Sequence, residues 1–298
     1  MRHFLIVTGL FALVAASPVG AAAPPGAVIS DGPRDAAHPA RMEPLQIMSH
    51  GAVLNAVFYL AAGAGPHPTV LLLHGLPGNE QNLDLAQSVR RAGWNTLTLH
   101  YRGSWGSGGR YSLANCLEDA HTAVAFLRDS KIIQKYGLQP GRIVVIGHSL
   151  GGFLAAKLGA QDSSLLGVGL IAAWDVGHDG PVLATLSKLQ MDDRFNDLPG
   201  RVVGATPQSV VAEAAAHAMD WSLEALGPGL AKDRMLIVTA HDGGRASGLR
   251  LADALKGMGA KVAAADIDTD HPFSDSRIAL QSVVIRWLAT LPGAPPSG

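Results

Sequence analysis

The sequence predicts one α/β domain in which a mostly parallel central sheet carries helices on both faces. Short strand-like runs such as 69–74 and 143–146 alternate along the chain with segments of helical periodicity. These runs are apolar almost throughout, which indicates strands buried on both faces of a parallel sheet rather than strands with one face in water. A chain of 298 residues is long enough to bury the core that such a sheet requires.

The chain divides into four parts by composition. Residues 1–22 combine a short basic start, an apolar stretch and a run of small residues, which is typical of a secretory signal peptide. Residues 23–44 mix Pro, Gly, Ala and Asp without periodicity and are predicted to form an extended lead-in. Residues 45–292 form the α/β domain, and 293–298 form a flexible tail. We therefore expect an exported protein, periplasmic or secreted, without a stable membrane anchor after the signal is removed.

The elements of the domain follow from periodicity and from turn residues. In chain order we expect a hairpin-like entry at 45–60, a strand at 69–74, a helix at 81–92, a strand at 94–100, a helix at 116–127 capped by Asn115, a strand at 143–146 followed by a helix, a strand at 165–174, a helix from 206 to about 226, a strand at 234–240, a helix at 247–258, a strand at 260–267 and a helix at 276–291. Residues 176–232 interrupt the alternation without a strand of their own, so we interpret them as a helical lid over the carboxyl edge of the sheet.

Composition excludes several classes of function. The formal net charge is −1, with 23 basic and 24 acidic residues, so nothing indicates nucleic-acid binding or a polybasic membrane patch. The only cysteine, Cys116, excludes an internal disulfide and a cysteine-based metal cluster. We expect it to pack as a small apolar residue on a helix.

The stretch 142–157 carries the strongest chemical signal. A β-branched run meets Gly-His-Ser-Leu-Gly at 147–151, and helix formers follow directly. A serine at the apex of so sharp a strand-to-helix turn needs small residues two positions before and after it, and Gly147 and Gly151 meet that need. Ser149 is therefore the candidate nucleophile, although an ordinary βα turn can have the same composition.

A serine hydroxyl needs a base, and the base needs an orienting acid. In a parallel sheet these groups are expected just beyond the carboxyl ends of the strands. His271, on the loop after the last predicted strand, is the best base, with His241 as second choice. Asp242, at the end of the strand 234–240, is the best acid. Asp268 and Asp270 are the reserve candidates, and Asp266 is a further rival.

The remaining candidates concern the oxyanion and the substrate. The backbone N–H groups of Leu76 and Leu150 are expected to form the oxyanion hole. The alternatives for three tryptophans are substrate contact or packing between lid and core: Trp105, Trp174 and Trp221. Arg102 could bind a substrate carboxylate, but the favoured expectation is that it ties its glycine-rich loop to neighbouring backbone or to a carboxylate such as Glu118 or Asp119.

From about residue 53 to 291 the chain resembles the α/β-hydrolase superfamily, especially its dienelactone-hydrolase and prolyl-oligopeptidase-like branches. The matching stretches are His-Gly-Leu-Pro-Gly at 74–78, Tyr-Arg-Gly at 101–103, Gly-His-Ser-Leu-Gly at 147–151, Asp-Gly at 242–243 and Asp-His-Pro-Phe at 270–273. The resemblance implies the α/β-hydrolase fold and hydrolysis through an acyl-enzyme, with no cofactor and no metal. It implies an esterase, lipase-like, thioesterase or peptidase activity.

Three functional hypotheses follow. The first is a serine hydrolase acting on a small-molecule carboxylic ester. The second is a small exported peptidase or amidase, although fewer than about 30 ordered residues could precede the core, which is less than one blade of the propeller that peptidases of that branch often carry. The third is a catalytically silent binding module, which would have no need of all three triad residues.

Overall fold

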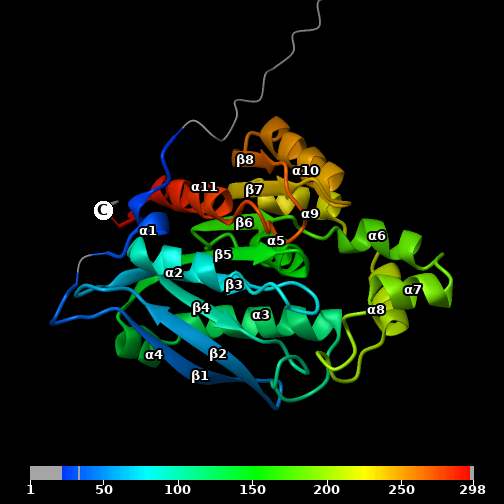
Figure 1. Ribbon diagram of the computed structural model, residues 1–298, viewed down its shortest axis with the longest axis horizontal. Coiled ribbons are helices and arrows are strands. Elements are labelled where there is room, and N and C mark those ends of the chain that lie inside the picture. The colour runs from blue at the N-terminus through cyan, green and yellow to red at the C-terminus, as the bar shows by residue number, and fades with distance from the viewer. Residues whose placement is uncertain (1–21, 33, 296–298) are drawn as a thin grey trace, which may run out of the picture.

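The fold is built around one eight-stranded sheet (Figure 1). The computed structural model describes residues 22–32 and 34–295. In the order in which they lie side by side, the strands are β1 (Arg41–Ser49), β2 (Ala52–Leu60), β4 (Asn95–Leu99), β3 (His67–Leu73), β5 (Leu138–His148), β6 (Gly167–Ile171), β7 (Arg234–Ala240) and β8 (Lys261–Ile267). The β1–β2 and β2–β4 pairs are antiparallel, and every pair from β4 to β8 is parallel. The predicted mostly parallel sheet is confirmed.

Helices cover both faces of this sheet. They are α1 (Gly26–Ile29), α2 (Leu83–Arg91), α3 (Leu113–Arg128), α4 (Ser130–Tyr136), α5 (Leu150–Gln161), α6 (Val176–Leu183), α7 (Lys188–Arg194), α8 (Pro207–Ala216), α9 (Leu223–Leu230), α10 (Arg245–Gly257) and α11 (Arg277–Ala289). On one face α2 and α11 pack against Val144 and Ile146, and on the other α3, α5 and α10 pack in a core with Ile143 and Val145. Adjacent residues of β5 thus enter two separate cores, which is why this strand is apolar at successive positions.

The amino-terminal part of the domain is a β1–β2 hairpin, as predicted for 45–60. The hairpin begins earlier than expected, because β1 starts at Arg41, inside the predicted lead-in 23–44. The short helix α1 also lies in that stretch, and Arg91 of α2 donates a hydrogen bond of 2.6 Å to the Ala27 carbonyl. Of the predicted signal peptide 1–22 only Ala22 is described, so that prediction lies outside the described residues.

Helix α3 corrects one predicted cap. The helix starts at Leu113 rather than at Cys116, and its cap is Ser112, whose hydroxyl accepts a hydrogen bond from the Asn115 N–H. Asn115 lies in the first turn and donates to the Arg110 carbonyl instead. The Ser112 hydroxyl satisfies a free N–H of the first turn, so the helix begins three residues earlier. Cys116 is buried on α3, as predicted.

The insertion between β6 and β7 is helical, but its subdivision differs from the prediction. The expected helix from 206 to about 226 is two helices, α8 and α9, each with its own amino-terminal cap. A capping box at Thr206 opens α8, and the Ser222 hydroxyl accepts from the Ala225 N–H to open α9. Helix α9 packs against α5 and α10 and belongs to the main layer, whereas α6, α7 and α8 stand beside the carboxyl edge of the sheet (Figure 1). None of the helices in the described part of the chain is both long and apolar enough to span a bilayer.

Candidate active site

Ser149 stands alone between β5 and α5 with φ 57° and ψ −121°, a strained backbone conformation for a residue with a side chain. The strand and the helix approach so closely that a Cβ atom at Gly147 would lie 1.9 Å from the Gly151 carbonyl oxygen. At Gly151 it would lie 2.2 Å from the Leu73 carbonyl oxygen. Both partners are backbone atoms, so only glycine fits at either position. The strain holds the serine side chain at the apex of the turn.

His271 and Asp242 meet at the neighbouring strand ends. His271 Nδ1 donates a hydrogen bond of 2.5 Å to Asp242 Oδ2, and the Gly244 N–H donates one of 2.9 Å to Asp242 Oδ1. Burial alone would raise the pKa of the Asp242 carboxyl, but the hydrogen bonds from His271 and from the backbone outweigh burial and lower the pKa. The carboxylate is therefore charged and orients the imidazole, whose Nε2 is left to accept a proton.

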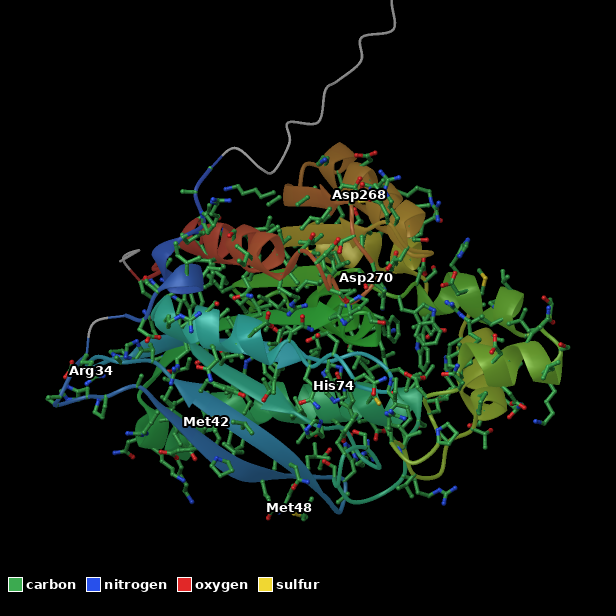
Figure 2. The ribbon with its side chains drawn as sticks, in the orientation of Figure 1. Arg34, Met42, Met48, His74, Asp268 and Asp270 are labelled. Carbon is green, nitrogen blue, oxygen red and sulfur yellow. The ribbon has the colours of Figure 1, made fainter. Side chains whose placement is uncertain are left out.

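The other carboxylates near His271 have different partners. Figure 2 shows Asp268 and Asp270 on the segment that follows β8. Asp268 is an exposed side chain whose Oδ1 lies 2.8 Å from His241 Nδ1. Asp270 accepts a hydrogen bond from the Ser274 N–H at 2.7 Å. Asp266, the further rival, is paired with Arg245. Among the described residues only Asp242 forms a hydrogen bond with the His271 ring, and the second-choice histidine, His241, is held by Asp266 and Asp268.

Ser149, Asp242 and His271 line one cavity of about 660 Å³. Leu76 lines the same cavity, and a Cβ atom at Gly75 would lie 2.8 Å from Ser149 Cβ, so the loop after β3 runs directly past the serine. Leu150 follows the serine as the first residue of α5. Neither the Leu76 nor the Leu150 N–H donates a hydrogen bond to another described residue. Both are thus available to an oxygen bound beside Ser149.

Two further histidines flank these groups as buried, neutral rings. Burial lowers the pKa of His148 to about 3, and it also lowers the pKa of His74 to about 3. His148 Nε2 donates a hydrogen bond of 2.9 Å to the main-chain carbonyl of His271, and the two rings lie 4.8 Å apart between centroids. Both rings are therefore packed and hydrogen-bonded, which suits a supporting place beside the site and not the role of the base.

The three tryptophans occupy different places. Trp174 lines the cavity with Ser149. Trp105 does not: it lines a separate cavity, and its indole Nε1 donates a hydrogen bond of 2.6 Å to the Pro77 carbonyl. Trp221 is buried against Phe153 and stacks on His217. Substrate contact is therefore compatible with the position of Trp174 only. Arg102 binds Asp119 at 2.7 Å and Glu118 at 2.5 Å, as predicted.

The outer wall of the cavity comes from the insertion, and sequence reasoning missed its residues. The lining residues are apolar side chains of α6, of its connection to α7 and of the residue after α7, joined by three charged ones: Val182, Leu183, Leu186, Phe195, Asp179, Arg194 and Asp197. Asn79, just after the predicted oxyanion loop, donates a hydrogen bond of 2.7 Å to Asp197. An insertion at this edge of the sheet was the only sequence signal for the wall, because no motif links these positions to the serine. In the described ranges, no three His, Cys, Asp or Glu side chains are grouped closely enough to hold a metal ion.

Comparison with known proteins gives the family context. A sequence model of the family described as alpha/beta hydrolase fold matches residues 68–244. A search of curated proteins returned no match. Three solved structures with a similar fold are a thermostable carboxylesterase, EstE1, cloned from a metagenomic library, a thermostable carboxyl esterase from Bacillus coagulans and an esterase from Pyrobaculum calidifontis.

The three structures agree in fold and differ widely in sequence. EstE1 is 20% identical, with a TM-score of 0.58, covering 84% of this chain and 90% of its own. The B. coagulans enzyme is 14% identical, with a TM-score of 0.64, and the match covers 83% of this chain and 98% of that enzyme. The P. calidifontis enzyme is 20% identical, with a TM-score of 0.59, and the match covers 85% of this chain and 88% of that enzyme. These likenesses show the fold alone, and the family is shown by the model that matches residues 68–244. Neither distinguishes the dienelactone-hydrolase or prolyl-oligopeptidase-like branch.

Proposed function

The chain belongs to the α/β-hydrolase fold family, and we propose that it is an exported serine hydrolase that cleaves carboxylic esters through Ser149, His271 and Asp242. The observation that carries this proposal is the convergence of the three side chains on one cavity, with His271 Nδ1 bonded to Asp242 at 2.5 Å. A histidine held in this tautomer by a charged carboxylate is the base that a serine nucleophile requires. The strained turn at Ser149 supports the same assignment.

The chemistry follows from the geometry. Ser149 Oγ attacks the ester carbonyl carbon while His271 Nε2 accepts the hydroxyl proton. The negative charge that develops on the carbonyl oxygen is stabilised by the N–H groups of Leu76 and Leu150 and by the amino end of α5. His271 then gives its proton to the leaving alcohol, which leaves an acyl group on Ser149. Water, activated by the same imidazole, attacks the acyl-enzyme and releases the carboxylic acid.

The composition of the cavity supports an ester with an apolar acyl or alcohol group. Val182, Leu183, Leu186, Phe195 and Trp174 give the cavity an apolar lining. Apolar groups gain free energy when such a lining removes them from water. The three structural neighbours named above are themselves esterases, which points in the same direction.

The decisive experiment compares Ser149→Ala with the unchanged enzyme on a series of p-nitrophenyl esters and aminoacyl anilides. We expect ester hydrolysis by the unchanged enzyme, and a loss of about 10⁴-fold or more in kcat for the variant. A fluorophosphonate probe should label the enzyme and not the variant, because labelling requires an activated serine. Faster cleavage of the anilides would favour a peptidase or amidase, and an enzyme that neither hydrolyses nor labels would be a binding module.

The export part of the proposal depends on residues 1–22, whose pattern is that of a signal peptide. It is tested by expressing the full chain in a bacterial host and sequencing the amino terminus of the protein recovered from the periplasm or the medium. We expect a mature chain that starts after Ala21 or Ala22. A protein that stays in the cytoplasm with its amino terminus intact would contradict export without affecting the hydrolase assignment.

A further inference from the structure

The loop after β3, which carries the proposed oxyanion donor Leu76, is held by a second segment, a contact that the sequence did not indicate. This segment, residues 100–105, follows β4. Tyr101 donates its hydroxyl to the His74 carbonyl at 2.9 Å, and Trp105 Nε1 donates to the Pro77 carbonyl at 2.6 Å. His100 contributes a third contact, because its Nδ1 lies 3.3 Å from His74 Nε2. The residues 74–77 are thus fastened from outside at three points.

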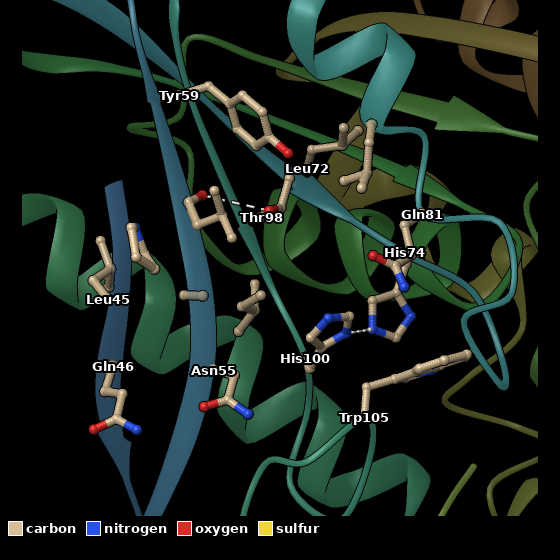
Figure 3. A pocket seen from close by; sticks show the side chains of 15 residues that line it. Leu45, Gln46, Asn55, Tyr59, Leu72, His74, Gln81, Thr98, His100 and Trp105 are labelled. Atoms are coloured by element: carbon tan, nitrogen blue, oxygen red, sulfur yellow. Dashed lines mark hydrogen bonds between the residues drawn. The ribbon is translucent and has the colours of Figure 1, made fainter. Parts of the chain in front are cut away.

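The direction of the hydrogen bonds through the two histidines is fixed by chemistry (Figure 3). His74 Nδ1 lies 2.7 Å from the Gly75 carbonyl oxygen. A carbonyl can only accept, so Nδ1 carries the proton. The buried His74 ring is neutral, so its Nε2 carries a lone pair and accepts from His100 Nδ1. The chain of donors therefore runs from His100 through His74 to the Gly75 carbonyl.

This series of hydrogen bonds ends at the Gly75–Leu76 peptide group, which carries one of the proposed oxyanion donors. The Gly75 carbonyl and the Leu76 N–H belong to one planar peptide unit, so a bond that fixes the carbonyl also fixes the direction of the N–H. A hydrogen bond accepted by the carbonyl also polarises the unit and strengthens the N–H as a donor. Close packing leaves little slack: a Cβ atom at Gly78 would lie 2.7 Å from both the His74 ring and Trp105 Nε1.

We propose that His100 is a positioning residue of the oxyanion hole, which orients the Gly75–Leu76 peptide through the His74 ring, while Trp105 fixes the adjoining Pro77 carbonyl. This inference rests on the proposed function, because it assigns a role within the same hydrolytic site. Neither side chain lines the cavity that contains Ser149. Both instead line a separate cavity of about 710 Å³ on the other side of the loop, with Gln81 and Asn55. The effect of His100 and Trp105 on the reaction therefore passes through the loop and not through contact with the substrate.

The test uses the full-length enzyme and three variants: His100→Phe, His100→Asn and Gln81→Leu. Phenylalanine keeps the ring shape and removes the donor, whereas the Asn amide nitrogen occupies nearly the position of Nδ1 and restores the donor. Gln81 lines the same outer cavity without a place in the chain of donors, so it is the matched control. The readouts are kcat and KM for p-nitrophenyl butyrate and the inhibition constant of a trifluoromethyl ketone, which forms a tetrahedral oxyanion adduct on serine.

We expect His100→Phe to lower kcat about tenfold and to weaken trifluoromethyl ketone binding by a similar factor, with KM changed less than about twofold, because loss of a whole oxyanion donor costs about 10²–10³-fold and misorientation costs less. His100→Asn should recover kcat to within about threefold, and Gln81→Leu should match the unchanged enzyme. A His100→Phe enzyme with unchanged kcat, or a His100→Asn enzyme as slow as His100→Phe, would overturn the proposal.

A second variant keeps the proposal testable if His100→Phe fails to fold. Trp105→Phe removes only the indole N–H from a partly exposed ring, and we expect it to lower kcat several-fold and to weaken the trifluoromethyl ketone in parallel. An unchanged kcat in folded Trp105→Phe would contradict the role given to the Pro77 contact. Failure of the inference is distinguishable from failure of the proposed function, since the latter appears as an unchanged enzyme that does not hydrolyse the ester at all.

Discussion

The cavity beside Ser149 has two walls that are built in different ways. Ser149 and Asp242 follow β5 and β7, and the last residues of both strands are buried. The other wall, which runs from α6 to the residues after α7, presents apolar side chains that solvent reaches, and Val182 is 61% exposed. Reacting groups thus stand on the part of the molecule that packing holds most firmly. Apolar groups that face the cavity from the insertion, such as Val182, are more exposed to solvent.

The insertion itself is held unevenly. Its second half is fastened to the main body, because the Glu213 carboxylate of α8 accepts hydrogen bonds of 2.8 Å from the N–H groups of both Leu113 and Ala114 at the start of α3. Backbone hydrogen bonds also join Val203 to Gly103 at 2.7 Å and to Tyr111 at 2.8 Å. The lid expected over 176–232 is therefore anchored through α8 and α9. Helix α6 packs closely on this anchored half, since a Cβ atom at Gly180 would lie 2.5 Å from the Ala214 carbonyl carbon, whereas Val182, farther along the helix, is exposed.

The largest effect should come from the acid of the strand-end wall. Asp242→Asn is expected to lower kcat about 10⁴-fold, or about 5.5 kcal/mol in barrier height, because an amide cannot hold His271 in the productive tautomer. The matched control is Asp268→Asn, which should change kcat less than about threefold, since Asp268 pairs with His241 on the surface. Steady-state kinetics on p-nitrophenyl butyrate measures both. A severe Asp268→Asn defect beside a mild Asp242→Asn defect would reverse the assignment of the acid.

The pH dependence of the reaction tests the roles of His271 and Asp242 without a mutation. An imidazole accepts a proton only when neutral, and imidazoles ordinarily titrate near ~6.5. The pKa of Asp242 is lowered, so its carboxylate stays charged throughout this range and adds no second step. We expect kcat/KM to rise about tenfold per pH unit at the acid end, to level off by about pH 8, and to be unaffected by EDTA. An optimum below about pH 4.5, or inactivation by EDTA, would rule out this mechanism.

An intermediate effect, on the free energy of unfolding, is expected where α8 of the insertion is joined to α3 of the main body. Glu213→Ala removes two capping contacts from α3, and it should lower the free energy of unfolding by about 2 kcal/mol. Urea unfolding followed by circular dichroism measures the change, and Glu224→Ala, on the exposed side of α9, is the control expected to change it by less than about 0.5 kcal/mol. Equal stability of the two variants would show that Glu213 does not anchor the insertion.

The smallest effect should come from the outer wall. Leu186→Ala removes apolar surface that faces the cavity, so the preference for p-nitrophenyl octanoate over the acetate should fall about threefold to tenfold, while kcat for the acetate stays nearly constant. Leu189→Ala is the control, because Leu189 lies on α7 and does not line the cavity. A Leu186→Ala enzyme that loses activity on both esters equally would show that this residue affects the reaction itself. It would contradict the claim that the outer wall affects only the choice of substrate.

Features that depend on a few neighbouring residues were determined by the sequence itself. The run of apolar residues in β5 indicates burial on both faces, and the glycines at 147 and 151 are required where a strand turns directly into a helix. The mostly parallel sheet and the turn at Ser149 follow from these local constraints, which act over a few residues whatever the rest of the chain does.

Features that depend on which loops meet were decided only by the tertiary structure. Asp266 lies near the end of β8, and Asp242, Asp268 and Asp270 follow the last two strands. Only the folded chain brings one of these four aspartates, Asp242, within 2.5 Å of His271. Trp105 turned out to hold the loop after β3 from behind, and α8 and α9 turned out to be separate helices. Side-chain partners across 28 to 118 residues, such as Trp105 with Pro77 or Asn79 with Asp197, leave no periodic trace in the sequence, because contact between distant segments is set by how the layers pack.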